Sequence, residues 1–290
     1  MDMKKGIIYI VVFLALCLYG CEGHGFSEDC ERANLVQVST DWKLVDFPGG
    51  MPDNLDLYLY QGECLVGVKH VDAKKGEFSF LPGSYQMIAC NNAAGLTFRN
   101  MGHYETAEIG LFTTKIGEVR WAEQPDMFVY DTNASFRIIN DESTPIVLFP
   151  KSALKTLELS FEVKSYWNRD IRYLNGSLSG LATKMNIHTG EIVREEDASQ
   201  AFYAVSSKEL PNLYKVSVYT LGVIPKMAGQ KNKKKLLTLN IEYVSGEKQS
   251  VVLDLSDAID NILVENKLSC KFDLVISSQS LKISLTNIEK

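Results

Sequence analysis

The sequence predicts an all-β protein built from two tandem β-sandwiches, and three observations support this fold class. Past residue 33, apolar and polar side chains alternate with the period of two that half-buried strands require. Turn residues recur roughly every 8–12 residues, which is the spacing typical of sandwiches and barrels. Only residues 254–264, "DLSDAIDNILV", show convincing helical spacing.

The first half of the chain contains a series of short strands that end at glycines and prolines. "DLYLY" over residues 56–60 and "SYQMIAC" over residues 84–90 are the clearest strands. Proline fixes φ and glycine tolerates positive φ, so both residues favour turns. We place these turns at residues 47–50, 61–63, 74–76 and 81–83. Residues 91–123 carry a weaker strand signal, and we interpret them as a longer excursion.

The second half begins after a break near residues 150–152. In "LKTLELSFEVK" over residues 154–164, apolar and polar residues alternate regularly, which predicts an antiparallel strand with one face exposed to solvent. A strand–turn–strand unit is expected around residues 243–247. Ser256 is the expected N-cap of the helix. The two sandwiches are predicted to span residues 33–150 and 153–290.

The N-terminus has the features of a secretory signal. Lys4 and Lys5 precede an apolar run over residues 7–18, which is shorter than the ~20 residues that cross a bilayer. Residues 18–21, Leu-Tyr-Gly-Cys, resemble a bacterial lipobox, in which cleavage before the cysteine is followed by acylation of its thiol. We therefore predict a signal peptide at 1–20, a lipid on Cys21 and a tether at 21–32. A plain signal peptide cut elsewhere is the alternative, because Tyr19 is bulkier than the usual lipobox residue.

Charge constrains the partners and the location. Glu22, Glu28 and Asp29 follow the predicted lipid site and resemble the signal that exports lipoproteins of Bacteroidetes to the cell surface, although a flexible solvated tether would have the same composition. The formal net charge is −6, and loss of residues 1–20 makes it one unit more negative. An acidic surface argues against nucleic acid, whose binding depends on Lys and Arg.

Four cysteines remain beyond the lipid site: Cys30, Cys64, Cys90 and Cys270. They form no CxxC pair, so neither a zinc nor a redox motif is predicted, and we expect no cofactor. Cys64 and Cys90 border strand-like runs, where a cysteine behaves as a small apolar residue. We favour free thiols, although three disulfide pairings are open to four cysteines outside the cytoplasm.

The sequence carries no recognisable catalytic motif, and we predict that the protein is not an enzyme. It lacks HExxH, GxSxG, a P-loop and GxGxxG. The acidic run at residues 195–197 is interpreted as a solvated loop. The absence of a motif argues only weakly against a β-sandwich glycosidase, because the paired carboxylates of such enzymes come from distant strands. The four histidines are scattered along the chain at His24, His70, His103 and His188.

Two features are candidate ligand contacts. Trp121 and Trp167, with the neighbouring Tyr166, are candidates for stacking against sugar rings, while the alternative is that they and Trp42 fill the cores. The basic run "QKNKKK" over residues 230–235 is interpreted as a solvated hairpin tip. Contact of this run with phosphate or an acidic glycan is the alternative.

Several segments, taken in order, resemble the fimbrial anchor proteins of the Bacteroidales fimbrillin superfamily. The segments are "CEGHGFSEDC" (21–30), "LDLYLYQGECLVG" (55–67), "LPGSYQMIACNN" (81–92), "LNGSLSGLATKMNIHTG" (174–190), "YTLGVI" (219–224) and "LLTLNIEYVSGEKQSVVLDLSDAI" (236–259). The resemblance implies two tandem transthyretin-like (Greek-key) β-sandwich domains. It also implies a lipoprotein of the outer membrane, acylated with palmitate and exposed on the surface, whose partner is a fimbrial stalk subunit (a fimbrillin).

Within the family that the chain resembles, a subunit belongs either to the fimbrial stalk or to its anchor. Stalk subunits of these type V fimbriae lose an N-terminal strand to an arginine-directed protease, and the vacated groove receives a strand from the neighbour. Cleavage at Arg32 would leave "VQVSTDW" (36–42) in place, and the sequence stops soon after "LKISL" (281–285). Both points favour a basal anchor or accessory subunit. Lys151 departs from the family, which has Arg near this junction. The alternative function is a surface glycan-binding lipoprotein without catalytic activity.

Overall fold

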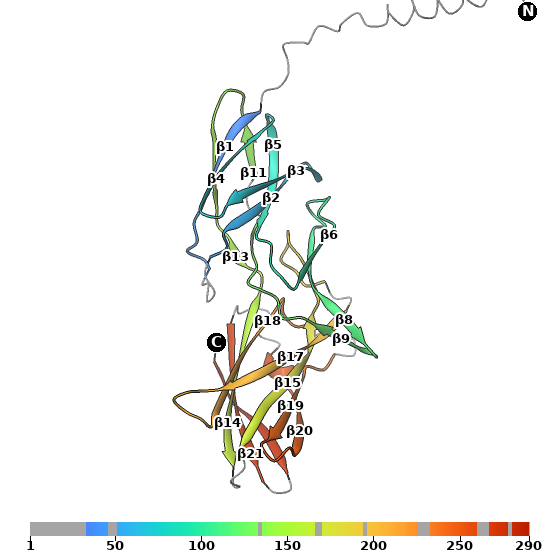
Figure 1. The fold of residues 1–290 in the computed structure, drawn as a ribbon. Helices are drawn as coiled ribbons and strands as arrows, with labels where there is room; N and C mark the ends of the chain where they lie inside the picture. The colour runs from blue at the N-terminus through green and yellow to red at the C-terminus, as the bar shows by residue number, and fades with distance from the viewer. Residues whose placement is uncertain are drawn as a thin grey trace, which may run out of the picture.

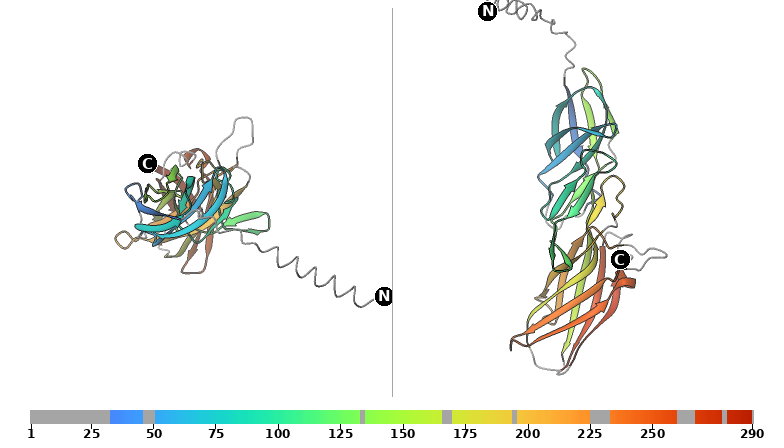
Figure 2. Two further views of the ribbon diagram at one scale, coloured as in Figure 1. Left: turned by 90° about the horizontal axis from the view of Figure 1, so that it is seen from above. Right: turned by 90° about the vertical axis from the view of Figure 1, so that its right-hand side faces the viewer.

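The computed structural model describes residues 33–289 apart from gaps at 46–50, 133–134, 166–169, 194–195, 225–232, 260–266 and 278–279. Nearly all the regular structure in these residues is β-strand, which confirms the all-β prediction. The chain forms two β-sandwich lobes stacked end to end, with the first half of the chain at one end and the second half at the other (Figures 1 and 2). In the described part of the chain, no helix has the length and apolarity to cross a bilayer.

Two sheets form the first lobe. One has the order β12-β1-β4, and the other has the order β13-β10-β5-β2-β3 with β11 paired to β5. Side chains from both sheets meet in a core that includes the fully buried Val36, Leu57, Leu59 and Met87. The strands of this lobe are β1 (Asn34–Thr40), β2 (Asn54–Gln61), β3 (Cys64–Asp72), β4 (Lys75–Phe80), β5 (Gly83–Cys90), β10 (Val129–Asp131), β11 (Ser135–Ile138), β12 (Thr144–Leu148) and β13 (Lys151–Ser152).

One continuous sheet forms the second lobe, and its two end strands, β20 and β22, lie next to each other. The order is β20-β19-β15-β17-β18-β14-β21-β22, and β17 pairs with β15 and, near its end, with β18. Leu157, Leu159 and Phe161 are at most 1% exposed, so the predicted alternation is confirmed. The strands are β14 (Lys155–Ser165), β15 (Ile171–Ala182), β17 (Asp197–Ser206), β18 (Leu213–Thr220), β19 (Leu236–Tyr243), β20 (Lys248–Asp254), β21 (Lys267–Ile276) and β22 (Leu281–Glu289).

Both lobes arrange their first strand in the same way. β1 pairs parallel with β12 and antiparallel with β4. β14 pairs parallel with β21 and antiparallel with β18. A parallel partner requires a long crossover rather than a hairpin, so this arrangement does not follow from adjacency in the sequence. The same pattern in each half identifies the lobes as tandem sandwiches.

Short strands from both halves form the junction between the lobes. β6 (Leu96–Arg99), β7 (Glu108–Leu111) and β16 (Lys184–Asn186) make a sheet of order β16-β7-β6. β8 (Thr113–Ile116) and β9 (Val119–Ala122) form a hairpin, and β9 lies parallel to β17. Residues 91–123, expected to be an excursion, therefore hold four strands. Because each half adds strands to the other, the bounds 33–150 and 153–290 stay a prediction.

The predicted helix begins where expected, but its cap differs. α2 spans Ser256–Ile259, and the rest of the expected helix lies outside the described residues. Ser256 is wrong as the N-cap, because it is the first helical residue and its hydroxyl accepts a hydrogen bond from the Lys235 backbone N–H at 3.0 Å. The Leu255 carbonyl instead accepts from the N–H groups of Ala258 and Ile259. Ser256 thus joins the helix to the start of β19.

Candidate functional site

The structure places only part of the predicted site. Cys21 and Trp167 lie outside the described residues, as does Tyr166. Trp121 lies in β9, where it is half-buried and opposite Thr114 of β8 and Ser199 of β17. Trp42 packs against the core of the first lobe. The lipid site and the stacking tryptophans therefore stay predictions.

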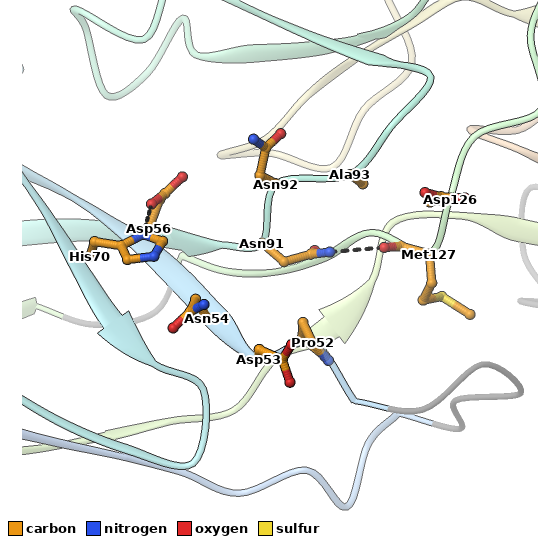
Figure 3. A pocket seen from close by; sticks show the side chains of 10 residues that line it. All are labelled: Pro52, Asp53, Asn54, Asp56, His70, Asn91, Asn92, Ala93, Asp126 and Met127. Carbon is orange, nitrogen blue, oxygen red and sulfur yellow. Dashed lines mark hydrogen bonds and ion pairs between the residues drawn. The ribbon is translucent and has the colours of Figure 1, made fainter.

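A polar pocket of about 460 Å³ opens beside the β2–β3 hairpin of the first lobe (Figure 3). The imidazole Nδ1 of His70 lies 2.7 Å from Oδ1 of Asp56. These residues are directly opposite each other in the β2–β3 register, so the contact is a cross-strand pair of an imidazole and a carboxylate. The pocket is lined by Pro52, Asp53, Asn54, Asp56, His70, Asn91, Asn92, Ala93, Asp126 and Met127.

The Asn91 side chain holds the floor of this pocket in place. Its Oδ1 accepts a hydrogen bond from the Val129 backbone N–H at 2.8 Å, and its Nδ2 donates to the Met127 carbonyl at 2.9 Å. The side chain therefore ties the end of β5 to the start of β10. The lining residues supply three carboxylates and one imidazole but no hydroxyl or thiol. Such a set can exchange protons and bind polar groups, but it offers no Ser, Thr or Cys nucleophile.

The described cysteines and histidines form no reactive centre. Among the described residues, no group of three or more His, Cys, Asp or Glu could hold a metal ion. Cys64, Cys90 and Cys270 are free thiols, and Cys30 lies outside the described residues. Burial raises the pKa of Cys270 to about 11, and burial, followed by the charge of Asp56, raises the pKa of Cys90 still further. Neither buried thiol is therefore a thiolate at neutral pH. The His188 ring packs on Tyr104, with the centroids 4.6 Å apart.

One ion pair joins the acidic and basic runs, and other residues of each run pair with charges elsewhere. Lys233 pairs with Asp197, and Lys234 lies 3.6 Å from Asp254. Glu196 pairs with Arg120 of β9 at 2.8 Å. Residues 195 and 230–232 of the two runs lie outside the described residues. Lys151 places its Nζ 4.9 Å from the centre of the Tyr130 ring.

The second lobe brings its two end strands next to each other along a line that we call the β20–β22 seam. β20 and β22 stand at opposite ends of the strand order, and within the described residues they share no ladder although they lie against each other. Val251 and Leu253 of β20, with Ile283 and Leu285 of β22, are half-buried against the core. An end strand leaves backbone N–H and C=O groups unpaired along one edge, so it can accept a further strand.

Sequence reasoning missed both the pocket and the seam, for different reasons. The pocket depends on the β2–β3 register and on the return of residues 126–127 to the end of β5, which no local pattern encodes. The seam had a signal in the alternation of residues 248–254 and 281–289. That signal predicts strands but not which strands end the sheet.

Several solved structures of Bacteroidales proteins have a fold similar to that of this chain. A candidate adhesin from Bacteroides ovatus aligns with a TM-score of 0.58 at 18% identity, over 78% of this chain and 84% of that chain. Candidate polysaccharide-binding proteins (DUF1812) from Bacteroides thetaiotaomicron align with a TM-score of 0.56 at 13% identity, over 89% and 98%. The fimbrial anchor protein Mfa2 from Porphyromonas gingivalis aligns with a TM-score of 0.53 at 14% identity, over 89% and 96%.

These similarities confirm the predicted resemblance to Bacteroidales fimbrial anchors and adhesins at the level of the fold. No curated protein matches the sequence. A family model described as a domain of unknown function, DUF5119, matches residues 20–203. Because that match covers more than half of the 290 residues, the chain belongs to the DUF5119 family.

Proposed function

We propose that the chain is a lipid-anchored surface subunit of an adhesive fimbrium, which attaches the first stalk subunit to the outer membrane and performs no catalysis. The observation that carries this proposal is the position of β1. This strand follows the predicted tether directly and is the middle strand of its sheet, between β12 and β4. The fold shared with the fimbrial anchor Mfa2 supports the same function.

The pairing of β1 suits a subunit that carries load. β1 pairs with β12 over residues 36–40 and with β4 over residues 34–39. It begins at the end of the molecule that is farthest from the second lobe (Figure 1). A pull on the tether therefore acts first on a strand held by hydrogen-bond ladders on both sides, and the ladders share the force. Cleavage after Arg32 would leave this strand in the sheet.

The predicted lipid supplies the attachment to the membrane. Acyl chains contribute roughly 0.8 kcal/mol for each buried methylene, so two or three chains on Cys21 would hold the protein on the membrane almost permanently. The apolar segment upstream is too short to span a bilayer as a helix.

We propose the β20–β22 seam as the docking place for the stalk subunit. A strand added to a free sheet edge gains main-chain hydrogen bonds, and its alternate side chains can pack on apolar positions. The half-buried Ile283 and Leu285 provide such positions along β22. The seam belongs to the second lobe, whereas the tether joins the first.

Deletion of the gene, combined with mass spectrometry of the mature N-terminus, tests the anchor function. We expect fimbriae to detach into the medium, and complementation with the Cys21→Ala variant should not restore their attachment. The wild-type N-terminal peptide should carry acyl chains on Cys21. Fimbriae that stay attached after deletion, or an unmodified Cys21 thiol in the mature protein, would refute the proposal.

A crosslinking experiment tests the docking place separately. Ser284 of β22 is exposed beside the seam, and Ser135 of β11 is an exposed control in the first lobe. With a thiol-reactive crosslinker, Ser284→Cys should capture a fimbrial stalk subunit and Ser135→Cys should not. Equal capture by the two variants would show that docking does not involve the seam.

A further inference from the structure

The outer face of the sheet β20-β19-β15-β17 in the second lobe has an unusual composition. Of the tyrosines that the structure describes, only Tyr173 and Tyr203 are exposed, at 47% and 71%. Both belong to this sheet, one on β15 and the other on β17. Tyrosine usually buries most of its ring, so two exposed tyrosines on one face require a reason.

The strand register brings these tyrosines close together. Tyr203 is directly opposite Asn175, and Tyr173 is two residues before Asn175 on the same strand. The two tyrosines are therefore diagonal neighbours, whose backbones are about 7–8 Å apart in an antiparallel pair. Arg172 lies 5.1 Å from the centre of the Tyr173 ring and 3.8 Å from Glu242. This contact fixes one side of the Tyr173 ring.

A row of amide and hydroxyl groups continues from Tyr203 across the sheet. The row runs through Asn175 and Asn240 to Ser250, since each of these residues is opposite the next. Nδ2 of Asn240 donates to Oδ1 of Asn175 at 3.3 Å. That bond leaves the Asn240 carbonyl oxygen and the Asn175 amino group able to bond a ligand. Three strand spacings make the row about 14 Å long.

The adjacent row is also uncharged. It consists of Ala201, Ser177, Thr238 and Val252, each opposite the next. Charges appear at the ends of the face, where Glu242 pairs with Lys248 at 3.1 Å and Asp254 pairs with Lys234. Tyr173 is opposite Glu242 and so borders one charged end. The two middle rows present the Tyr203 ring, amides, hydroxyls and the small apolar residues Ala201 and Val252, without charge.

We propose that this face, which we call the tyrosine face, binds a neutral oligosaccharide. Sugar rings present apolar C–H faces that stack on exposed aromatic rings and hydroxyl groups that bond to amides and hydroxyls. The uncharged middle rows complement a neutral polyhydroxylated chain better than a charged one. A second protein copy fits less well, because the cores of stable protein interfaces are apolar, whereas the centre of this face is the Asn175–Asn240 pair.

Trp121 extends the tyrosine face along the sheet. It is opposite Ser199, which alternates with the buried Ala198 and Gln200 and therefore points outward like Tyr203. Paired residues in neighbouring strands point to the same side of a sheet. The half-buried Trp121 thus lies on the same side as the tyrosines, about 14 Å from Tyr203 along β17. It provides a second stacking position for a longer oligosaccharide.

Binding of defined oligosaccharides to the full chain in detergent micelles tests the proposal. The probes are neutral glucan, mannan and galactan oligosaccharides, with a sulfated heparin oligosaccharide as the charged comparison. Tyr203→Ala should weaken binding of the best neutral probe about tenfold, and Tyr203→Phe should retain most of it because the ring remains. Phe149→Ala is the matched control, since Phe149 is 48% exposed in the first lobe. Trp121→Ala should weaken the longer probes more than the shorter ones.

The thermal unfolding temperature of each variant separates loss of binding from loss of fold. Failure of the wild type to bind any neutral probe would overturn the proposal. Equal affinity of the wild type and a Tyr173→Ala, Tyr203→Ala double variant would also overturn it, as would capture of a fimbrial subunit by a photocrosslinker at position 203. Attachment of fimbriae should be unchanged in Tyr203→Ala, so this result is independent of the proposed anchor function.

Discussion

The Asn91 side chain offers the sharpest test of how the first lobe is held together. It is 7% exposed and bonds two backbone groups, the Val129 N–H and the Met127 carbonyl. Replacement by Ala removes both bonds. The neighbouring Asn92 is exposed and lines the same pocket. Asn92→Ala is therefore a matched control at the adjacent position.

The expected loss follows from these two bonds. A neutral hydrogen bond contributes about 1 kcal/mol net, and a buried group left without a partner costs about 1–3 kcal/mol. The Val129 N–H belongs to a residue with no exposed surface, so it would become such a group. The Met127 carbonyl faces the pocket, where water can replace the lost donor. We expect Asn91→Ala to lower the free energy of unfolding by about 3 kcal/mol and Asn92→Ala by less than about 0.5 kcal/mol.

Urea unfolding, followed by circular dichroism and tryptophan fluorescence, measures this difference. If the two probes give one transition, both variants can be compared by their midpoints. If the lobes unfold separately, the comparison uses the transition that reports on the first lobe. A loss for Asn91→Ala no larger than that for Asn92→Ala would show that these hydrogen bonds do not hold the lobe together.

Two further predictions concern packing and thiol reactivity. A Cβ at Gly176 would lie 2.3 Å from the Thr238 carbonyl oxygen, so Gly176→Ala should destabilise the second lobe by roughly 1–3 kcal/mol in thermal unfolding, whereas Gly102→Ala should be neutral because nothing lies within 4 Å of its Cβ. With maleimide in native conditions, the exposed Cys64 should react at pH 8. Cys270, whose pKa burial raises to about 11, should stay unlabelled even at pH 9 and react only after unfolding, and its labelling in the native protein would contradict this assignment.

The strands could be predicted from the sequence because their signals are local. The alternation of residues 154–164 depends only on which side of one strand faces the core, so it identifies β14 without knowledge of its neighbours. The β2–β3 turn is equally local, since Gly62 has a φ of +59° that glycine adopts without strain. The N-cap at Ser256 failed because a tertiary partner, the Lys235 N–H, uses the hydroxyl.

The junction between the lobes could not be predicted, because its pairings are non-local. β9 pairs with β17 and β7 pairs with β16 across about 75 residues of sequence. Each of the strands β7, β9 and β16 is too short to show an alternation of apolar and polar residues. It forms a strand only because it pairs with a partner that is distant in the sequence. The division of the sequence near residue 150 follows local breaks, and such breaks do not record strands that cross between halves.

The tyrosine face shows where sequence reasoning about ligands stops. Trp121 and Trp167 were predicted from residue type alone, which cannot separate a stacking platform from a core residue. The distinction depends on exposure and on the partner opposite each side chain, and both follow from the register. Tyr173 and Tyr203 lie 30 positions apart in the sequence, and "RYLNG" and "AFYAV" contain no shared motif. Only the pairing of Asn175 with Tyr203 and with Asn240 assembles their rings and the amides into one surface. A ligand site on a sheet face is thus a property of strand order and register, and the same register that turns Tyr173 and Asn175 outward turns Leu174 and Leu178 into the core.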